Sequence, residues 1–297
     1  MHDEIYFTTE EAAGYLRLKE RKLYELASGG AVPCSKVTGK WLFPRAALDR
    51  WIAAGLSRPE GFVAEDPPVI IGGSHDPLLE WATRQSRSGY ALLSEGSEAG
   101  LDRLERNEVA MAAIHLHGTG DDDETENIEA VAGRAGLHDA VLIAFARREQ
   151  GFLVAPGNPL GIGTVEDLQQ RRVRVGLRPV GAGAQLLLER LALRSGVSLD
   201  GLRCTESRFA TGPDLALAIR AGEIDCGIAT RAVAATHGLG FVPLLWERFD
   251  LATRRRTYFE PAAQTLFAFL RHGSVQARAE ALGGYDVSQC GAIRLNR

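Results

Sequence analysis

Three short turns in this 297-residue chain combine glycine with small polar residues in a way that can bind an anion. Residues 73–76 (GSHD) follow the apolar run VIIG, residues 95–97 (EGS) follow YALLS, and residues 181–183 (GAG) follow VRVGLRP and a valine. Where such a turn joins a strand to a helix, backbone N–H groups and the positive end of the helix dipole point at the same place. Three converging turns would form a strong oxyanion site, although each alone is also typical of an ordinary turn or helix cap.

The segments that must position these turns alternate between short apolar runs and helical stretches from Val69 onward. Such alternation is typical of parallel strands covered by helices, where ligands bind at the carboxyl ends of the strands. Proline, glycine and acids concentrate between the patterned segments only in residues 57–68, which are therefore the best domain boundary. The sequence predicts an N-terminal domain at residues 1–57, a linker at 58–68 and an α/β ligand-binding domain at 69–297.

All the lysines of the chain, Lys19, Lys22, Lys36 and Lys40, lie within the first forty residues. Residues 1–58 contain nine Lys and Arg against seven Asp and Glu, a net charge of +2, which leaves −6 for the rest of the chain. This asymmetry indicates a basic domain that binds polyanions, joined to an acidic body.

Residues 6–54 predict two short helices, a hairpin and a third helix. Thr8 or Thr9 can cap the first helix, and the second helix, at about residues 20–28, ends before two glycines, where a left-handed cap costs least. Residues 32–43 alternate enough to form a hairpin around a Thr-Gly-Lys turn. This order of elements is that of a winged helix-turn-helix.

The segments TTEEAAGYL, KLYELASGG and KVTGKWLFPRAALDRWI closely resemble the excisionase-type, MerR-like winged helix-turn-helix family. The resemblance implies that the second helix enters the major groove of DNA while the wing touches the flanking backbone. Lys19 stands where the family commonly has a small hydroxyl residue, which weakens the expected cap of the second helix. The residues implied at the DNA are Lys19, Arg21, Lys22, Tyr24, Lys36, Thr38 and Lys40.

The body resembles the cytoplasmic relatives of periplasmic molybdate-binding proteins, a PBP-like domain often found behind this type of helix-turn-helix. The resemblance covers about residues 69–287 and is carried by a combination of segments that includes IGGSHDPLLEWA, EGSEAGLDRLERNEVAMAAIHL, VRVGLRPVGAGAQLLLERL and GGYDVSQCG. It implies a type II binding-protein fold, in which two α/β lobes close on a ligand like a hinge. One lobe would comprise about residues 69–145 plus 247–297, and the other about residues 146–246.

The pocket-facing positions of that family, together with the neighbouring histidine of the first turn, give a set of candidate ligand-binding residues. They are Ser74, His75, Ser97, His115, Arg178, Gly181, Ala182, Gly183, Arg231 and Tyr258. Where the family usually has a GSGTR-like turn, this chain has GAGAQ at residues 181–185, which removes two hydroxyls and an arginine and weakens a bidentate grip on an oxyanion. Molybdate or tungstate is the first expected ligand, and a small organic acid or other metabolite is the alternative.

The residues offer little for catalysis or for a bound metal. The four cysteines are scattered without a CxxC pair, and the sequence places no Cys or carboxylate at a ligand spacing from His75, His115 or His117. A nucleophile elbow, a Walker lysine and a dinucleotide-binding glycine motif are all missing from the sequence. We therefore expect neither an enzyme nor a cofactor, and no metal site.

The sequence as a whole predicts a cytoplasmic, ligand-sensing transcription regulator that binds double-stranded DNA. One small DNA-binding domain makes few base contacts, so we expect a homodimer on a pseudo-palindromic operator. The sequence has no apolar stretch long enough to cross a membrane and no export leader, so we expect no membrane partner. Two alternatives remain open: an enzyme of small molecules on the same fold, and a structural DNA-binding factor whose body serves only in assembly.

Overall fold

The computed structural model describes residues 6–37, 39–54, 66–117 and 124–297. The chain divides into two compact units, Met1–Glu65 and Asp66–Arg297, and the division falls inside the segment predicted as a linker. Residues 58–65 of that segment and Thr38 of the expected wing lie outside the described residues. No helix in the described ranges is both long and apolar enough to cross a membrane.

The N-terminal unit begins with the predicted pair of helices, α1 (Thr9–Tyr15) and α2 (Glu20–Ser28). Thr8 caps α1 through a capping box, in which its hydroxyl accepts from the backbone of Glu11 and the Glu11 carboxylate accepts from the backbone of Thr8. Lys19 occupies the N-cap of α2 and makes no capping hydrogen bond, as its departure from the family pattern predicts.

A small sheet and a third helix complete this unit. Strand β1 (Tyr6–Phe7) pairs antiparallel with β2 (Phe43–Pro44), and α3 (Arg45–Ala54) follows. The expected wing is held by one bridge, in which Ser35 and Leu42 exchange two hydrogen bonds of 2.8 Å. The core of the N-terminal unit consists of the buried side chains Ala12, Ala13, Leu23, Ala27, Val32, Phe43 and Leu48.

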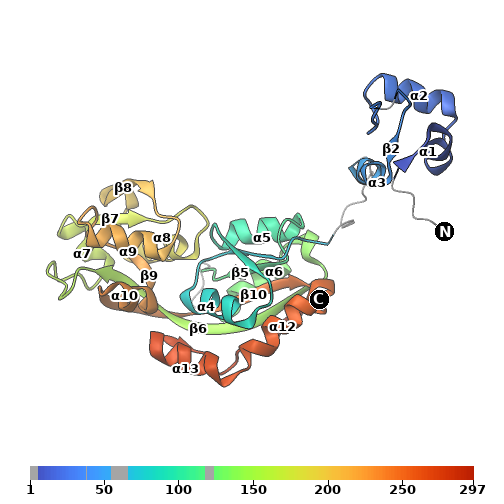
Figure 1. Cartoon of the computed structure of the whole chain (residues 1–297). Coiled ribbons are helices and arrows are strands. Elements are labelled where there is room, and N and C mark those ends of the chain that lie inside the picture. The colour runs from blue at the N-terminus through green and yellow to red at the C-terminus, as the bar shows by residue number, and fades with distance from the viewer. Residues whose placement is uncertain (1–5, 38, 55–65, 118–123) are drawn as a thin grey trace. The chain divides into compact units, whose positions relative to one another are not determined.

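The second unit is built on one ten-stranded sheet with the main order β4-β3-β5-β10-β6-β9-β7-β8 (Figure 1). The strands of the first lobe are β3 (Ile70–Gly73), β4 (Ala91–Ser94) and β5 (Met111–Ile114), and those of the second lobe are β7 (Arg174–Leu177), β8 (Arg203–Arg208) and β9 (Cys226–Thr230). Within each set the neighbouring strands are parallel. Two short strands, β11 (Tyr285–Asp286) and β12 (Ile293–Asn296), pair with β6.

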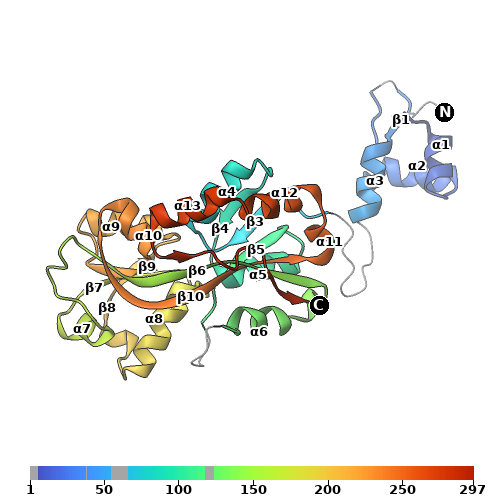
Figure 2. The same ribbon diagram turned by 90° about the horizontal axis from the view of Figure 1, so that it is seen from below.

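Two long antiparallel strands, β6 (Ala140–Val154) and β10 (Gly240–Arg254), connect the lobes. The second half of β10 pairs with β5 of the first lobe, whereas the second half of β6 pairs with β9 of the second lobe. Both strands therefore run through both lobes, as Figures 1 and 2 show, and the predicted lobe boundaries fall inside them. The register of β10 shifts at Pro243/Leu245 and again at Phe249/Asp250.

Helices cover both faces of the sheet in each lobe. The first lobe carries α4 (Pro77–Ser86), α12 (Pro261–Leu270) and α13 (Gly273–Leu282) on one face, with α5 (Ser97–Glu105) and α6 (Glu126–Ala132) on the other (Figure 2), and α11 (Arg255–Tyr258) follows β10. The second lobe carries α7 (Val165–Gln170), α8 (Gly183–Arg194), α9 (Gly212–Arg220) and α10 (Arg231–His237). Short 3-10 turns lie at Ala135–Leu137 and Leu199–Gly201.

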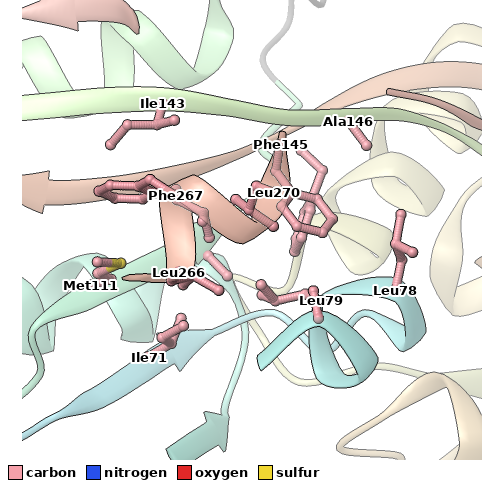
Figure 3. Packing of buried hydrophobic residues seen from close by; sticks show 14 of the residues in the cluster. Ile71, Leu78, Leu79, Met111, Ile143, Phe145, Ala146, Leu266, Phe267 and Leu270 are labelled. Atoms are coloured by element: carbon pink, nitrogen blue, oxygen red, sulfur yellow. The ribbon is translucent and has the colours of Figure 1, made fainter. Parts of the chain in front are cut away.

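The largest core lies under α4 and α12 in the first lobe. Figure 3 shows Leu78 and Leu79 of α4 facing Leu266 and Leu270 of α12, with Phe145 of β6 among them. A second cluster fills the opposite face, and the second lobe has two clusters of its own, one with α7 and α8 and one with α9 and α10. Each lobe is thus a sheet with a separate core on each face, which is the two-lobed α/β fold that the sequence predicts.

Candidate functional site

The carboxyl ends of strands from both lobes meet at a small cavity. Its volume is about 20 Å³, which is enough for about one water molecule. The residues that line it come from both lobes and from β6: Ser74, His75, Gly96, His115, Arg148, Gln150, Arg178, Ala182, Ala184, Ala210, Gly212, Ala229, Thr230 and Val233. A larger ligand requires the lobes to move apart.

The N-terminal ends of three helices face this cavity. Gly96 is the N-cap of α5, Ala182 is the N-cap of α8, and Gly212 is the first residue of α9. Helix N-termini carry a partial positive charge and direct backbone N–H groups outward, so together they favour a negative charge in the cavity.

The lobes are in close contact beside the cavity. The backbone N–H of Glu98 on α5 donates to the carbonyl of Gly181 in the second lobe, at 3.3 Å. A Cβ atom on Gly183 would lie 2.0 Å from the carbonyl oxygen of His115, so only glycine allows this approach. The GAG turn therefore closes against the first lobe, and its glycines are used for contact between the lobes.

A fully buried arginine, Arg148 of β6, forms the floor of the site. Its Nη1 donates to Asp76 Oδ2 at 2.9 Å, and its Nε donates to Glu247 Oε1 at 2.6 Å. The guanidinium also lies over the ring of Phe249, 3.9 Å from its centroid, and Tyr285 donates its hydroxyl to the same Asp76 oxygen. Two carboxylates compensate this cation, so its position is fixed.

Glu247 of β10 accepts hydrogen bonds from several polar side chains of the site. Its Oε2 accepts from His115 Nδ1 at 3.0 Å and from His117 Nε2 at 2.8 Å, and its Oε1 accepts from Gln150 Nε2 at 2.9 Å. Burial opposes its charge, but His115, Arg148 and the donated hydrogen bonds hold the pKa of this carboxyl well below its usual range. Burial lowers the pKa of His115 to about 4, against the attraction of Glu247. His115 is therefore neutral at neutral pH, with its proton on Nδ1.

In the described ranges, His115, His117 and Glu247 are the only group of side chains with the composition of a metal site. One ligand atom from each of His115, His117 and Glu247 lies within 4.8 Å of the others. The sequence could not reveal the carboxylate, since it lies more than a hundred residues away from the histidines. Both imidazoles already donate to one carboxylate oxygen, Arg148 adds a positive charge to the other, and Gly183 packs against His115 Nδ1. This arrangement fits a hydrogen-bonded support for the cavity better than a cation site.

A second arginine of the site, Arg178 after β7, has no carboxylate partner among the described residues. Its Nε and Nη2 donate to the backbone carbonyls of Phe209 and Ala210, at 2.8 and 2.9 Å. Burial, together with repulsion from Arg148, lowers the pKa of Arg178 to about 10. An anion in the cavity would compensate this charge.

Two buried polar atoms in the cavity lining lack a hydrogen-bond partner in the described part of the chain. They are Gln150 Oε1 and Thr230 Oγ1, which belong to residues paired across β6 and β9. Buried polar atoms without partners are rare and destabilising, so they indicate that the cavity normally holds a polar molecule.

Most of the ligand-binding residues predicted from the sequence come together here. Ser74, His75, His115, Arg178 and Ala182 line the cavity. Gly181 and Gly183 form the contact between the lobes described above.

Ser97 is near the cavity but does not line it. Its hydroxyl donates to the backbone carbonyl of His115 and accepts from the backbone N–H of the same residue, at 2.9 and 3.0 Å. It also lies 3.0 Å from the Ser74 hydroxyl, and Ser97 is completely buried. Contrary to the sequence-based interpretation, Ser97 joins α5 to the end of β5 and offers the ligand no free hydroxyl.

Arg231 and Tyr258 lie elsewhere and do not line the cavity. Arg231 pairs with Glu149 and stacks on Phe241, 4.5 Å from the ring centroid. Tyr258 stacks on Phe267 in the core of the first lobe. Gln185, which replaces the family arginine, is also turned inward, because its Oε1 accepts from the backbone of Arg178.

Sequence reasoning missed the residues that hold the site together, Asp76, Arg148, Gln150 and Glu247. A signal was present for Arg148 and Gln150, since the polar letters RREQ interrupt an otherwise apolar segment, AVLIAFARREQGFLV. In a strand buried on both faces, polar residues at such positions require partners.

The residues predicted to contact DNA lie on the surface of the N-terminal unit. Lys19, Arg21, Lys22, Tyr24, Lys36 and Lys40 are exposed, whereas Thr38 is outside the described residues. Among the described residues, Arg21 and Lys22 make only long ion pairs with Glu25, at 3.6 and 3.5 Å. Lys36 lies over the ring of Trp41, 5.0 Å from its centroid, and Tyr24 contacts the same ring edge-on. These charges are available to a polyanion.

This architecture defines a DNA-binding domain joined to a two-lobed binding-protein domain. The family model of the PBP superfamily domain matches residues 79–271, more than half of the chain, and a helix-turn-helix domain model matches residues 6–55. The chain therefore belongs to the PBP superfamily and carries an N-terminal helix-turn-helix domain, as the resemblances in its sequence imply.

A curated relative and several solved structures share this organisation or this fold. The uncharacterized protein YvgK of Bacillus subtilis (strain 168) is 24% identical over 312 residues that cover 99% of both chains. A hydrogen-peroxide-bound cysteine-to-serine mutant of Corynebacterium glutamicum OxyR has a TM-score of 0.51 at 12% identity, over 93% of this chain and 89% of that one. A putative phosphate ABC transporter substrate-binding protein from Clostridium perfringens, with bound phosphate, has a TM-score of 0.53 at 12% identity, over 72% and 96% of the two chains. At these identities the solved structures show the fold alone.

Proposed function

We propose that this protein is a transcription regulator in which a small anion, bound between the lobes of the body, changes the affinity of the helix-turn-helix domain for DNA. The presence of a helix-turn-helix domain and a PBP superfamily domain in one chain supports ligand-responsive DNA binding. The observation that supports an anion is Arg178, which lines the cavity, is partly buried, and among the described residues donates its guanidinium N–H groups only to backbone carbonyls. Three helix N-termini line the same cavity.

Molybdate and tungstate are the first candidates for this anion, on the basis of the family resemblance. The alternative is a small organic acid, because the GAGAQ turn lacks the hydroxyls and the arginine of the family pattern. The inward orientation of Gln185 supports this alternative, since its amide does not replace the missing guanidinium in the cavity.

The coupling between the two domains is thermodynamic linkage. The anion can change DNA affinity only by as much as its own affinity differs between two arrangements of the protein, typically about 1 to 3 kcal/mol. We propose a cytoplasmic homodimer, in which closure of the lobes changes the spacing of two DNA-binding domains on a pseudo-palindromic operator.

Thermal unfolding of the full chain with molybdate, tungstate, sulfate, phosphate and a panel of small organic acids tests the ligand. An anion at about 100 times its dissociation constant should stabilise the protein by about 2.7 kcal/mol. Arg178→Met should abolish this stabilisation, whereas Arg174→Met, which removes an arginine of β7 that pairs with Asp225, should preserve it.

The same anion must also change affinity for DNA in a binding titration. An anion that stabilises the protein without changing its affinity for DNA would contradict the proposed role as a ligand-responsive regulator. Chemical turnover of the anion would favour the enzyme alternative, and no response to any anion would favour a structural DNA-binding factor.

A further inference from the structure

The side chain of Gln150 has an orientation that its neighbours determine. Gln150 is 2% exposed and lies in β6 at the floor of the cavity. Its Nε2 donates to Glu247 Oε1 at 2.9 Å. The reversed amide would bring its oxygen against a carboxylate oxygen, and two acceptors repel each other. The Oε1 atom must therefore point away from Glu247.

That oxygen is an acceptor that no described residue satisfies. Gln150 Oε1 is buried without a hydrogen-bond partner in the described ranges, and Gln150 lines the cavity beside Arg148 and Thr230. A carbonyl oxygen can only accept a hydrogen bond. A molecule in the cavity that satisfies it must therefore carry a proton to donate.

The neighbouring groups favour a ligand with negative charge. Arg178 and the helix N-termini of α5, α8 and α9 are donors or positive charges, and they favour an anion. Thr230 can donate or accept, so it does not discriminate between ligands. The site thus favours a small molecule that carries negative charge and also one proton that it can donate in a hydrogen bond.

We propose that the effector is an oxyanion that retains a proton at neutral pH, a phosphate or a phosphonate, and that Gln150 is the residue that selects it. This inference rests on the proposed anion site, and it disfavours molybdate and tungstate, the candidates that the family resemblance places first. Molybdate, tungstate and sulfate carry no proton at neutral pH, so each would place an unprotonated oxygen against Gln150 Oε1. The cost of leaving such a buried acceptor unsatisfied is equivalent to a discrimination of about 10- to 100-fold.

Calorimetric titration of the full chain with phosphate, methylphosphonate, sulfate, molybdate and tungstate tests the proposal. Phosphate and sulfate have the same shape and similar size, so the ratio of their affinities measures the effect of the proton alone. We expect phosphate and methylphosphonate to bind at least 10-fold more tightly than the other three anions at pH 7.5. Sulfate or molybdate binding as tightly as phosphate would overturn the inference while leaving the anion site intact. Failure of every anion to bind would overturn the proposed site as well.

Two variants identify the residue responsible. Gln150→Met keeps the length of the side chain but removes the acceptor, and should reduce the preference for phosphate over sulfate to about 1. Thr230→Val removes the other unsatisfied atom and should weaken both anions while leaving their ratio unchanged. A preference that survives in Gln150→Met, or that disappears in Thr230→Val, would contradict the assignment. The comparison of phosphate with sulfate on the unmodified chain still tests the proposal if either variant fails to fold.

Discussion

The charged side chains of the N-terminal domain and those between the lobes serve recognition in opposite ways. Arg21 and Lys22 are exposed and make ion pairs of 3.5 Å or more with Glu25. Arg148 is buried and donates to two carboxylates at 2.9 and 2.6 Å. Exposed, loosely held charges can adapt to a long polyanion, but the binding that they provide weakens as the salt concentration rises. Buried and fixed charges can recognise only one shape and one protonation state.

Removal of the shared carboxylate should have the largest effect and would test this contrast directly. Glu247→Ala leaves His115 and Gln150 without their acceptor and removes one of the two carboxylates of Arg148. Unfolding in denaturant should therefore show a loss of about 3 to 5 kcal/mol. Glu25→Ala removes an exposed partner of two cations and should cost no more than about 1 kcal/mol. Equal losses in the two variants would contradict the difference between the regions. Should Glu247→Ala fail to fold, Glu247→Gln preserves the packing and should still lose stability.

Acidification should destabilise the site between the lobes before it affects the exposed charges. The folded pKa of His115, about 4, lies below its usual value of 6.5, so the unfolded state binds the proton first as the pH falls. Stability that is fully present above pH 6.5 should decrease towards pH 4, by on the order of 3 kcal/mol. Glu247, whose pKa is also lowered, should add a further loss as the pH falls below its usual pKa.

Denaturant unfolding at pH 7.5, 6 and 5 measures this dependence. His115→Gln should flatten the profile between pH 6.5 and 4. His138→Gln, which changes an exposed histidine of the same lobe, should leave the profile unchanged. A flat profile in the unmodified protein would show that His115 is not buried in its neutral form.

Ser97→Ala separates a structural hydroxyl from a ligand-binding one. Since the Ser97 hydroxyl bonds both backbone groups of His115, its loss should cost about 1 to 3 kcal/mol in stability. Ser74→Ala, at a residue that lines the cavity, should change anion affinity more than stability. If Ser97→Ala kept full stability and lost anion affinity, the interpretation drawn from the sequence would be right and the structural one wrong.

The smallest change in stability is expected for Lys22→Ala, where the change in DNA binding should be clear. One lost phosphate contact should reduce the slope of log affinity against log salt by about 1. The free energy of unfolding should change by less than about 1 kcal/mol, because the ion pair is exposed. Arg220→Ala, at an exposed arginine of the body, should leave the slope unchanged.

The sequence was sufficient for the fold where local signals agree with the global structure. Thr8 and Glu11 specify a capping box, and the second helix has the predicted bounds of Glu20–Ser28. The turns after β3 and β7 also meet at the cavity, because parallel strands present their carboxyl ends at one edge.

The connecting strands and the floor of the site could not be predicted in the same way. The polar residues 147–150 suggest a break in an apolar segment, yet β6 continues from Ala140 to Val154. Arg148 and the amide nitrogen of Gln150 donate to Glu247, about a hundred residues away, and no local pattern encodes such a pairing. The partners of the Ser97 hydroxyl could not be predicted for the same reason, since they are the backbone groups of His115, eighteen residues away.

The two register shifts in β10 lie on either side of Glu247, at Pro243/Leu245 and Phe249/Asp250. A shift locally interrupts the ladder of hydrogen bonds and lets a strand bend, so bending of β10 at these two points would move the carboxylate that orients Gln150 and His115. The points at which β10 can bend and the acceptor that orients the cavity side chains therefore lie in one short piece of backbone. A substitution in this segment that changes the ligand preference should also change how easily β10 bends. The effector concentration at which the protein responds should change with it.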